Sequence, residues 1–342
     1  MRIALDAMGG DHAPESTVAG ALAAAEHGFE IVLVGDEGII LEQIADAKVG
    51  GLPPTCTVHH ATEVVEMEDS PGAVLRRKRD SSLRVAFELV SKGQADAVVT
   101  MGNSGAALAA GMFVAGRLPG VLRPAITALV PSQKAPVVVL DVGANVECKP
   151  EHLQQFALMG RALAQVGLRR ESPSVALLAN GTEDEKGTDL TRAAALLLQE
   201  TQGLTYSGLV EPKGVFEGNV DVVVTDGFTG NVFLKTAEAT SQQMTALVRE
   251  AADSGILARA GGLLLRPALR RTLARLDAAE VGGALLLGID AVAVIGHGSA
   301  DARSVGNALR TAARLQGEGL LERVAAALAT QEPGHAVDRS SR

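Results

Sequence analysis

Short apolar runs rich in valine, isoleucine and leucine alternate with amphipathic helical stretches along almost the whole chain. The runs lie at residues 3–5, 31–34, 57–59, 97–100, 125–130, 137–140, 175–178, 222–225 and 291–295. Runs this short and apolar are typical of buried strands, because β-branched side chains suit a sheet covered on both faces. The alternation predicts an α/β protein with a mostly parallel sheet between two layers of helices.

The stretches between these runs define the expected helices. Apolar positions at helical spacing predict helices near residues 15–26, 37–47, 71–91, 104–115, 150–166, 188–200, 231–252, 302–316 and 319–329. No internal repeat and no long linker divides the chain, so we expect a single α/β/α domain over residues 1–330. Residues 331–342 are polar, and we expect a disordered tail there.

The composition narrows the classes of function. Aromatic residues make up 2 % of the chain and the formal net charge is −9, so we expect no nucleic-acid surface. The first residues hold too short an apolar run for a signal peptide, and no segment reaches the roughly 20 apolar residues of a membrane span. Cys56 and Cys148 lie in no metal-ligand spacing and fit a reducing compartment. We therefore expect a soluble cytoplasmic protein.

Polar, glycine-rich turns follow six of the predicted strands, at residues 6–12, 102–105, 141–145, 180–187, 226–231 and 297–299. Because ligands bind at the carboxyl ends of strands in open α/β sheets, we expect these turns to gather around one crevice. The candidate ligand-binding residues within them are Asp6, Gly9, Gly10, Asp11, Asn103, Ser104, Gly105, Asp141, Asn145, Asn180, Glu183, Asp226, Gly227, Thr229 and Gly230.

The chemistry of these turns favours an anion of phosphate size. Each turn offers free backbone N–H groups at a helix start, and Lys186 is the obvious cation near a strand end. There is no Walker motif, no GxGxxG after the first strand and no GxSxG elbow, so we expect neither ATP nor NAD as a cofactor. Asp6, Asp141 and their equivalents could be metal ligands, but strand-end aspartates more often cap helices and loops, and we expect no metal.

Two basic segments leave alternatives open. Residues 254–277 carry five arginines, and Leu265, Leu269, Leu273 and Leu276 form one helical stripe, with Pro267 expected to begin or kink a helix. This segment is either a helical hairpin in a dimer interface or a basic amphipathic element on an anionic membrane. Residues 76–79 are either a solvated helix face or a docking patch for an acidic partner.

Several long motifs together resemble the bacterial acyl-ACP:phosphate acyltransferase family, PlsX. They are DAMGGDHAP, GNSGA, LDVGAN, NGTEDEKG, FEGNVD, TDGFTGNV, GGALLLG and HGS, and the resemblance runs from Met1 to about Ala329. The chain departs from the family pattern at Met101, in TMGNSGA, and at Ala239, where the family has glycine.

The resemblance implies a three-layer, Rossmann-like α/β/α fold related to phosphotransacetylases and isocitrate and isopropylmalate dehydrogenases. It implies a cytosolic, metal-independent homodimer without a cofactor that moves a long-chain acyl group from acyl carrier protein to inorganic phosphate. A membrane glycerol-3-phosphate acyltransferase would use the acyl phosphate for phospholipid synthesis. Peripheral membrane association, also implied, would use the protrusion at 254–277, whose candidate contacts with membrane or carrier protein are Leu265, Arg266, Leu269, Arg270, Arg271 and Leu273.

Such a reaction needs no protein nucleophile, because a thiol with a pKa near 8.5 leaves readily when phosphate attacks the thioester. We expect Lys186 to hold the phosphate or the oxyanion, Asn231 to orient it, and His12 or His297 to accept a proton. Two alternatives are a short-chain phosphotransacetylase that uses coenzyme A thioesters and a non-catalytic anion-binding scaffold at the membrane.

Overall fold

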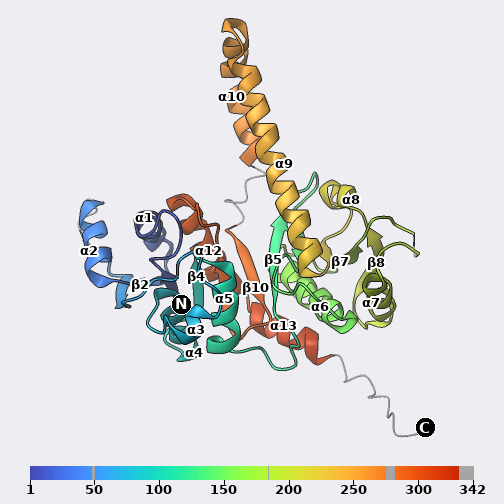
Figure 1. Ribbon diagram of the computed structural model, residues 1–342, viewed down its shortest axis with the longest axis horizontal. Helices are drawn as coiled ribbons and strands as arrows, with labels where there is room; N and C mark the ends of the chain where they lie inside the picture. The colour runs from blue at the N-terminus through green and yellow to red at the C-terminus, as the bar shows by residue number, and fades with distance from the viewer. Residues whose placement is uncertain (48–50, 184, 275–281, 331–342) are drawn as a thin grey trace.

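The computed structural model describes residues 1–47, 51–183, 185–274 and 282–330. Within them, eleven strands form one sheet in the order β3-β2-β1-β4-β11-β10-β5-β6-β9-β7-β8, with helices on both faces (Figure 1). The expected α/β fold with a mostly parallel sheet is confirmed. The strands are β1 (Arg2–Asp6), β2 (Glu30–Gly35), β3 (Cys56–His60), β4 (Ala97–Thr100), β5 (Ala125–Val130), β6 (Val137–Leu140), β7 (Ser174–Leu178), β8 (Thr205–Val210), β9 (Val222–Val224), β10 (Ala284–Leu287) and β11 (Val292–Ile295).

The helices fill the connections between these strands. They are α1 (Glu15–Ala24), α2 (Glu37–Asp46), α3 (Ala73–Arg76), α4 (Ser82–Ser91), α5 (Ser104–Ala110), α6 (Pro150–Gly167), α7 (Asp189–Glu200), α8 (Pro212–Glu217), α9 (Gly227–Asp253), α10 (Ile256–Ala274), α12 (Ala302–Gly317) and α13 (Leu320–Ala329), with short turns η1 (Ala25–His27) and η2 (Gly111–Ala115).

Strand direction reverses three times in the middle of the sheet. Strands β3, β2, β1, β4 and β11 are parallel. The pairs β11–β10, β10–β5 and β5–β6 are antiparallel, and β6, β9, β7 and β8 are again parallel to one another. The carboxyl ends of the first set and of the last set therefore lie at opposite edges of the sheet.

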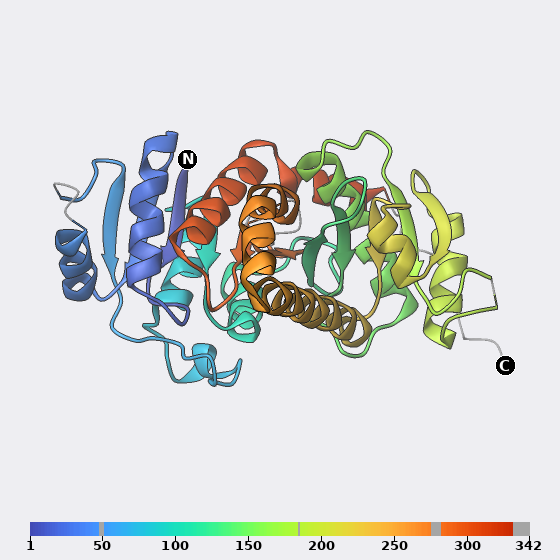
Figure 2. The same ribbon diagram turned by 90° about the horizontal axis from the view of Figure 1, so that it is seen from above.

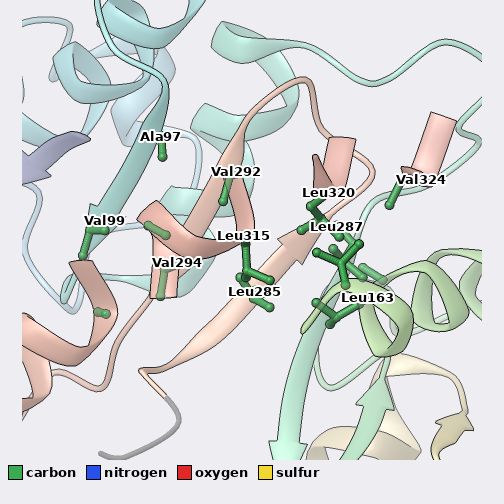
Figure 3. Close-up of a cluster of buried hydrophobic side chains, with 14 of the residues drawn as sticks. Ala97, Val99, Leu163, Leu285, Leu287, Val292, Val294, Leu315, Leu320 and Val324 are labelled. Carbon is green, nitrogen blue, oxygen red and sulfur yellow. The ribbon is translucent and has the colours of Figure 1, made fainter. Parts of the chain in front are cut away.

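Two apolar cores flank the sheet because side chains alternate between its faces along each strand. Val138 and Leu140 of β6 belong to one core, while Val137 and Val139 belong to the other. Figure 3 shows part of the first core, in which side chains of β4, β10 and β11 meet leucines of α6, α12 and α13. Helices α4 and α5 cover the other face. This double cover explains why the strands are apolar throughout.

Helices α9 and α10 form a hairpin that projects from the body of the molecule (Figures 1 and 2). With 27 residues, α9 is about 40 Å long at 1.5 Å per residue. Its buried residues are Gly227 and Gly230, both in its first turn. On α10, Leu257 and Leu264 are 89 % and 85 % exposed. No helix in the described parts of the chain is long and apolar enough to cross a bilayer.

Some expected elements differ from the structure. The single helix predicted over 71–91 is wrong: α3 ends at Arg76 and α4 begins at Ser82. A continuous helix is broken because the backbone at residues 80–82 pairs with Glu63: the N–H of Glu63 donates to the carbonyl of Asp80 at 3.1 Å, and its carbonyl accepts from the N–H of Ser82 at 3.0 Å. Strands β8 and β10 and helix α8 were not predicted.

The predictions for the protrusion are tested only in part. Helix α10 runs through Pro267, so this proline does not begin a helix. Leu265 is 53 % exposed. The side chains of Arg266, Leu269, Arg270, Arg271 and Leu273, the position of Leu276 and the tail at 331–342 lie outside the described residues.

Candidate active site

Asp141, directly after β6, organises the loop that follows it. Its buried carboxylate accepts hydrogen bonds from the backbone N–H groups of Ile126, Gly143, Ala144 and Asn145 and from Asn145 Nδ2, at 2.6–3.1 Å. Burial raises the pKa of Asp141, and these N–H donors oppose the shift. The carboxylate thus fixes the loop from residue 141 to residue 145 as one rigid unit.

The first turn of α9 packs directly onto this loop. The N–H of Gly227 donates to the carbonyl of Asn145 at 2.8 Å. A Cβ at Gly230 would lie 1.9 Å from the carbonyl oxygen of Asp141, and one at Gly227 would lie 2.7 Å from the carbonyl oxygen of Asn145. Only glycine permits so close an approach.

Two polar side chains of this turn have different surroundings. Asp226 caps α9: its carboxylate accepts from the N–H of Thr229 at 2.9 Å and from its hydroxyl at 2.7 Å. Asn231 is exposed, and its Cγ lies 3.7 Å from the position that a Cβ at Gly143 would occupy. Asn231 therefore stands over the loop that Asp141 organises, with its amide open to solvent.

Lys186 belongs to a compact turn after β7. Asn180 Oδ1 accepts from the N–H of Gly187 at 3.0 Å, and the N–H of Lys186 donates to the carbonyl of Glu183 at 2.9 Å. The exposed Lys186 side chain crosses Gly181, where a Cβ would lie 2.6 Å from its Cγ. The turn thus presents one ammonium group beside the carboxyl end of β7.

A cavity of about 830 Å³ lies between this turn and α9. Asn180, Gly187, Thr225, Asp226 and Thr229 contribute to its wall, so two of the predicted turns border the same space. Its remaining wall is largely apolar and comes from β7, β9, α6, α8, α9 and the start of α7. A concave space of this size with a few polar groups at one part of its wall is typical of a ligand site.

A second cluster of turns surrounds Asp6, at the end of β1. This buried carboxylate accepts from the hydroxyl of Thr100 at 2.7 Å and from the N–H of Met8 at 3.3 Å, and burial raises its pKa. A Cβ at Gly9 would lie 2.4 Å from Asp6 Oδ2, and one at Gly10 would lie 3.0 Å from Met101 Cβ. The glycines therefore serve close packing of loops in this cluster.

The other predicted residues of this cluster either link neighbouring loops through hydrogen bonds or lie on the surface. The N–H of exposed Asp11 donates to the carbonyl of Gly298 at 2.8 Å. Asn103 caps α5 through the N–H of Ala106, and its amide donates to three carbonyls of residues 66–69. His12, Ser104 and His297 are exposed and Gly105 half-buried, and His297 Nδ1 lies 2.9 Å from the Ser299 hydroxyl.

The predicted turns thus divide into two clusters of three. The first, after β1, β4 and β11, we call the Asp6 cluster; the second, after β6, β7 and β9, we call the Asp141 cluster. The prediction that all six lie at one edge of the sheet is wrong, because three antiparallel pairings separate β11 from β6. The four predicted catalytic residues divide in the same way: His12 and His297 belong to the Asp6 cluster, Lys186 and Asn231 to the Asp141 cluster.

Neither cysteine has the surroundings of a nucleophile. Burial raises the pKa of the Cys148 thiol to about 11, and the nearby Asp141 carboxylate adds to the shift. Burial also raises the pKa of Cys56, which begins β3. In the described parts of the chain, no group of three or more His, Cys, Asp or Glu side chains is arranged to hold a metal ion.

Some residues near the Asp141 cluster were not predicted from the sequence. His152 in the first turn of α6 accepts from the N–H of Lys149 at 3.2 Å, and burial, together with Arg123, lowers its pKa. Arg123 directly precedes a proline at the start of β5, where nothing in a single sequence singles it out. The aromatic pair Phe216 and Phe233, with centroids 5.5 Å apart, was also missed. Only its contact across the cavity makes it informative.

Known proteins share both the sequence and the fold. The profile of a family described as "Fatty acid synthesis protein" matches residues 1–323. A phosphate acyltransferase of Myxococcus xanthus is 49 % identical, over 91 % of this chain and 89 % of its own length. One of an Anaeromyxobacter species is 48 % identical, over 96 % and 91 %.

Solved structures agree at the level of the fold. A phosphotransacetylase from Streptococcus pyogenes superposes with a TM-score of 0.63 and 14 % identity, covering 93 % of this chain and 94 % of that one. A branched-chain phosphotransacylase from Enterococcus faecalis gives a TM-score of 0.53 and 16 % identity, over 92 % and 98 %. These structures show the fold alone. The sequence matches above establish that the chain belongs to the family described as "Fatty acid synthesis protein" and is an enzyme, a phosphate acyltransferase.

Proposed function

We propose that this enzyme moves a long-chain fatty acyl group from acyl carrier protein to inorganic phosphate, giving an acyl phosphate. The observation that carries the proposal is the Asp141 cluster, where Asn180 and Gly187 of the turn that holds Lys186 border one cavity together with the first turn of α9. The names of the relatives support phosphate as the acceptor. The motifs of the sequence that resemble the acyl-ACP:phosphate acyltransferases support the carrier protein as the donor.

The chemistry needs orientation more than acid or base. A phosphate oxygen attacks the thioester carbonyl carbon, the C–O bond forms, and the C–S bond then breaks to release the carrier's thiolate. A thiol with a pKa near 8.5 leaves without protonation. No covalent enzyme intermediate is required, in keeping with the raised pKa of Cys148. What remains is to hold an anion and to stabilise the developing oxyanion.

We assign these tasks to the Asp141 cluster. Lys186 supplies the positive charge for phosphate or for the oxyanion, and Asn231 supplies an amide donor fixed by the packing of α9 on the Asp141 loop. Asn180, Asp226 and Thr229 shape the space between them. His12 and His297 belong to the Asp6 cluster at the opposite edge of the sheet, so we assign neither of them a step in this reaction. The chemistry proceeds without a metal or cofactor.

Partners and location follow from the same proposal. The acyl phosphate would pass to a membrane glycerol-3-phosphate acyltransferase on the way to phosphatidic acid, so cytoplasmic enzyme and bilayer must meet. The exposed leucines of the projecting hairpin, Leu257 and Leu264 among them, suit an apolar contact of this kind or the interface of a homodimer. We propose that the hairpin makes both contacts.

The reaction is tested by incubating the enzyme with inorganic phosphate and either palmitoyl-acyl carrier protein or acetyl-coenzyme A, and trapping acyl phosphate as hydroxamate. We expect product from the first donor and at least a hundredfold less from the second. Preference for acetyl-coenzyme A would make the enzyme a short-chain phosphotransacetylase. Phosphate binding without turnover of any thioester would favour the scaffold.

The proposed contacts of the hairpin are tested in two ways. Sedimentation with anionic liposomes measures membrane binding, and analytical ultracentrifugation measures dimerisation. Leu264→Glu, on the hairpin, should lose liposome binding or dimerisation. The matched control Leu196→Glu, at an exposed position of α7, should lose neither. Unchanged binding and unchanged dimerisation in Leu264→Glu would contradict the assignment.

A further inference from the structure

The cavity beside the candidate site continues along one face of α9. Its α9 wall consists of Thr229, Val232, Phe233, Thr236, Ala237, Thr240 and Ser241. This spacing of three and four residues keeps all of them on one side of the helix. At 1.5 Å per residue, the wall from Thr229 to Ser241 is about 18 Å long. We call this space the α9 groove.

The groove is largely apolar: besides the hydroxyls of Thr236, Thr240 and Ser241 on α9, its polar side chains lie where it meets the candidate site. Leu153, Leu178 and Val224 line it from the body of the protein. Phe216 of α8 packs against Phe233 of α9, with their ring centroids 5.5 Å apart. The groups shared with the candidate site, such as Asn180 and Asp226, belong to the part that borders the Lys186 turn and the start of α9. A ligand that fits has a polar head there and an apolar body along the helix.

We propose that the α9 groove binds the fatty acyl chain of the thioester substrate. The proposal rests on the function proposed above and adds the residues that select the chain. An extended chain of single bonds advances about 1.2 Å per bond, one third of the roughly 3.5 Å per residue of extended backbone. The groove therefore accommodates about 15 bonds, which is the length of a long-chain fatty acid. A two-carbon acetyl group would leave it almost empty.

The cross-section of the groove is also sufficient for a hydrocarbon chain. A volume of about 830 Å³ over about 18 Å gives a mean cross-section of about 46 Å². A single extended hydrocarbon chain fits within this cross-section.

If the groove binds the acyl chain, substitutions that block part of it should change the chain-length preference of the enzyme. In Ala237→Phe a ring fills the groove midway, and in Ser241→Trp it closes the outer end at an exposed position where folding is not at risk. Each buried methylene contributes about fourfold to binding. We therefore expect the ratio of kcat/KM for hexadecanoyl- to octanoyl-acyl carrier protein to fall at least tenfold in Ala237→Phe and less in Ser241→Trp.

A matched control and the possible outcomes distinguish failure of the acyl-chain assignment from failure of the proposed function. Gln242→Phe adds the same ring at an exposed position of α9 that does not line the groove, and should leave the ratio unchanged. An unchanged ratio in folded Ala237→Phe and Ser241→Trp would overturn the acyl-chain assignment while leaving the proposed function intact. Loss of dimerisation at an unchanged ratio would overturn it in favour of a second copy. If the wild type forms no acyl phosphate from any donor, the proposed function itself fails.

Discussion

The Asp6 and Asp141 clusters are both built around a buried aspartate at the end of a strand, but their surroundings differ. Each begins with a buried aspartate directly after an apolar strand, and in each burial raises the pKa of that carboxyl. Around Asp6 the neighbouring loops pack on one another through Gly9 and Gly10. Around Asp141 the loop is held by five N–H donors, and the start of α9 that packs on it also borders an open cavity. A strand-end aspartate therefore builds a rigid loop, and the neighbouring elements decide whether that loop borders a site.

The largest expected effect is on the loop held by Asp141. Asp141→Ala leaves the N–H groups of Ile126, Gly143, Ala144 and Asn145 without their acceptor, and unsatisfied buried donors are costly. We expect the free energy of unfolding, measured with urea, to fall by about 4 kcal/mol, against about 2 kcal/mol for Asp6→Ala. A greater loss for Asp6→Ala would reverse the comparison.

The contact between α9 and the Asp141 loop gives the next effect. In Gly230→Ala the new Cβ clashes with the carbonyl oxygen of Asp141, so α9 must move away. We expect a loss of about 3 kcal/mol in stability by thermal unfolding. Gly72→Ala, where no atom lies within 4 Å of the new Cβ, serves as control and should stay within about 0.5 kcal/mol of the wild type. Equal stability of the two variants would show that α9 is not fixed by this contact.

The histidines of the Asp6 cluster should matter less to the reaction. Phosphate attack on a thioester needs little base catalysis, so His12→Ala and His297→Ala should each lower kcat/KM by less than tenfold, where essential base catalysis contributes about 10²–10⁴. Steady-state assays with palmitoyl-acyl carrier protein measure this. A loss of a thousandfold in either variant would move the chemistry toward the Asp6 cluster.

The smallest expected effect concerns Cys148. Because its pKa is raised to about 11, only about one thiol in a thousand is ionised at pH 8, against about one in four for an ordinary cysteine. In a Cys56→Ala background, alkylation at pH 8 should be roughly a hundredfold slower than for a free thiol and should rise tenfold per pH unit up to about pH 11. Cys148→Ala should retain full activity. Fast alkylation at pH 7 would refute the raised pKa.

Features of the structure that depend on local sequence patterns could be predicted, whereas those that depend on contacts between distant residues could not. The strands β1, β4, β6, β7, β9 and β11 and the polar turns after them follow from local patterns of β-branched residues and glycines. The division of the turns could not be predicted, because it depends on β10, whose antiparallel pairing with β5 and β11 joins residues far apart in the chain. The groove could not be predicted either, since Phe216 and Phe233 meet only when α8 packs beside α9.

The central claim is that the Asp141 cluster binds the reacting anion, and Lys186→Ala tests it most directly. The measurement is kcat/KM for acyl phosphate formation from palmitoyl-acyl carrier protein and phosphate, with circular dichroism to verify the fold. The control is Lys213→Ala, which removes an exposed lysine of α8 that pairs with Glu217. We expect a loss of about 10²–10³ for Lys186→Ala and none for the control. A folded Lys186→Ala enzyme with wild-type kcat/KM would contradict the account.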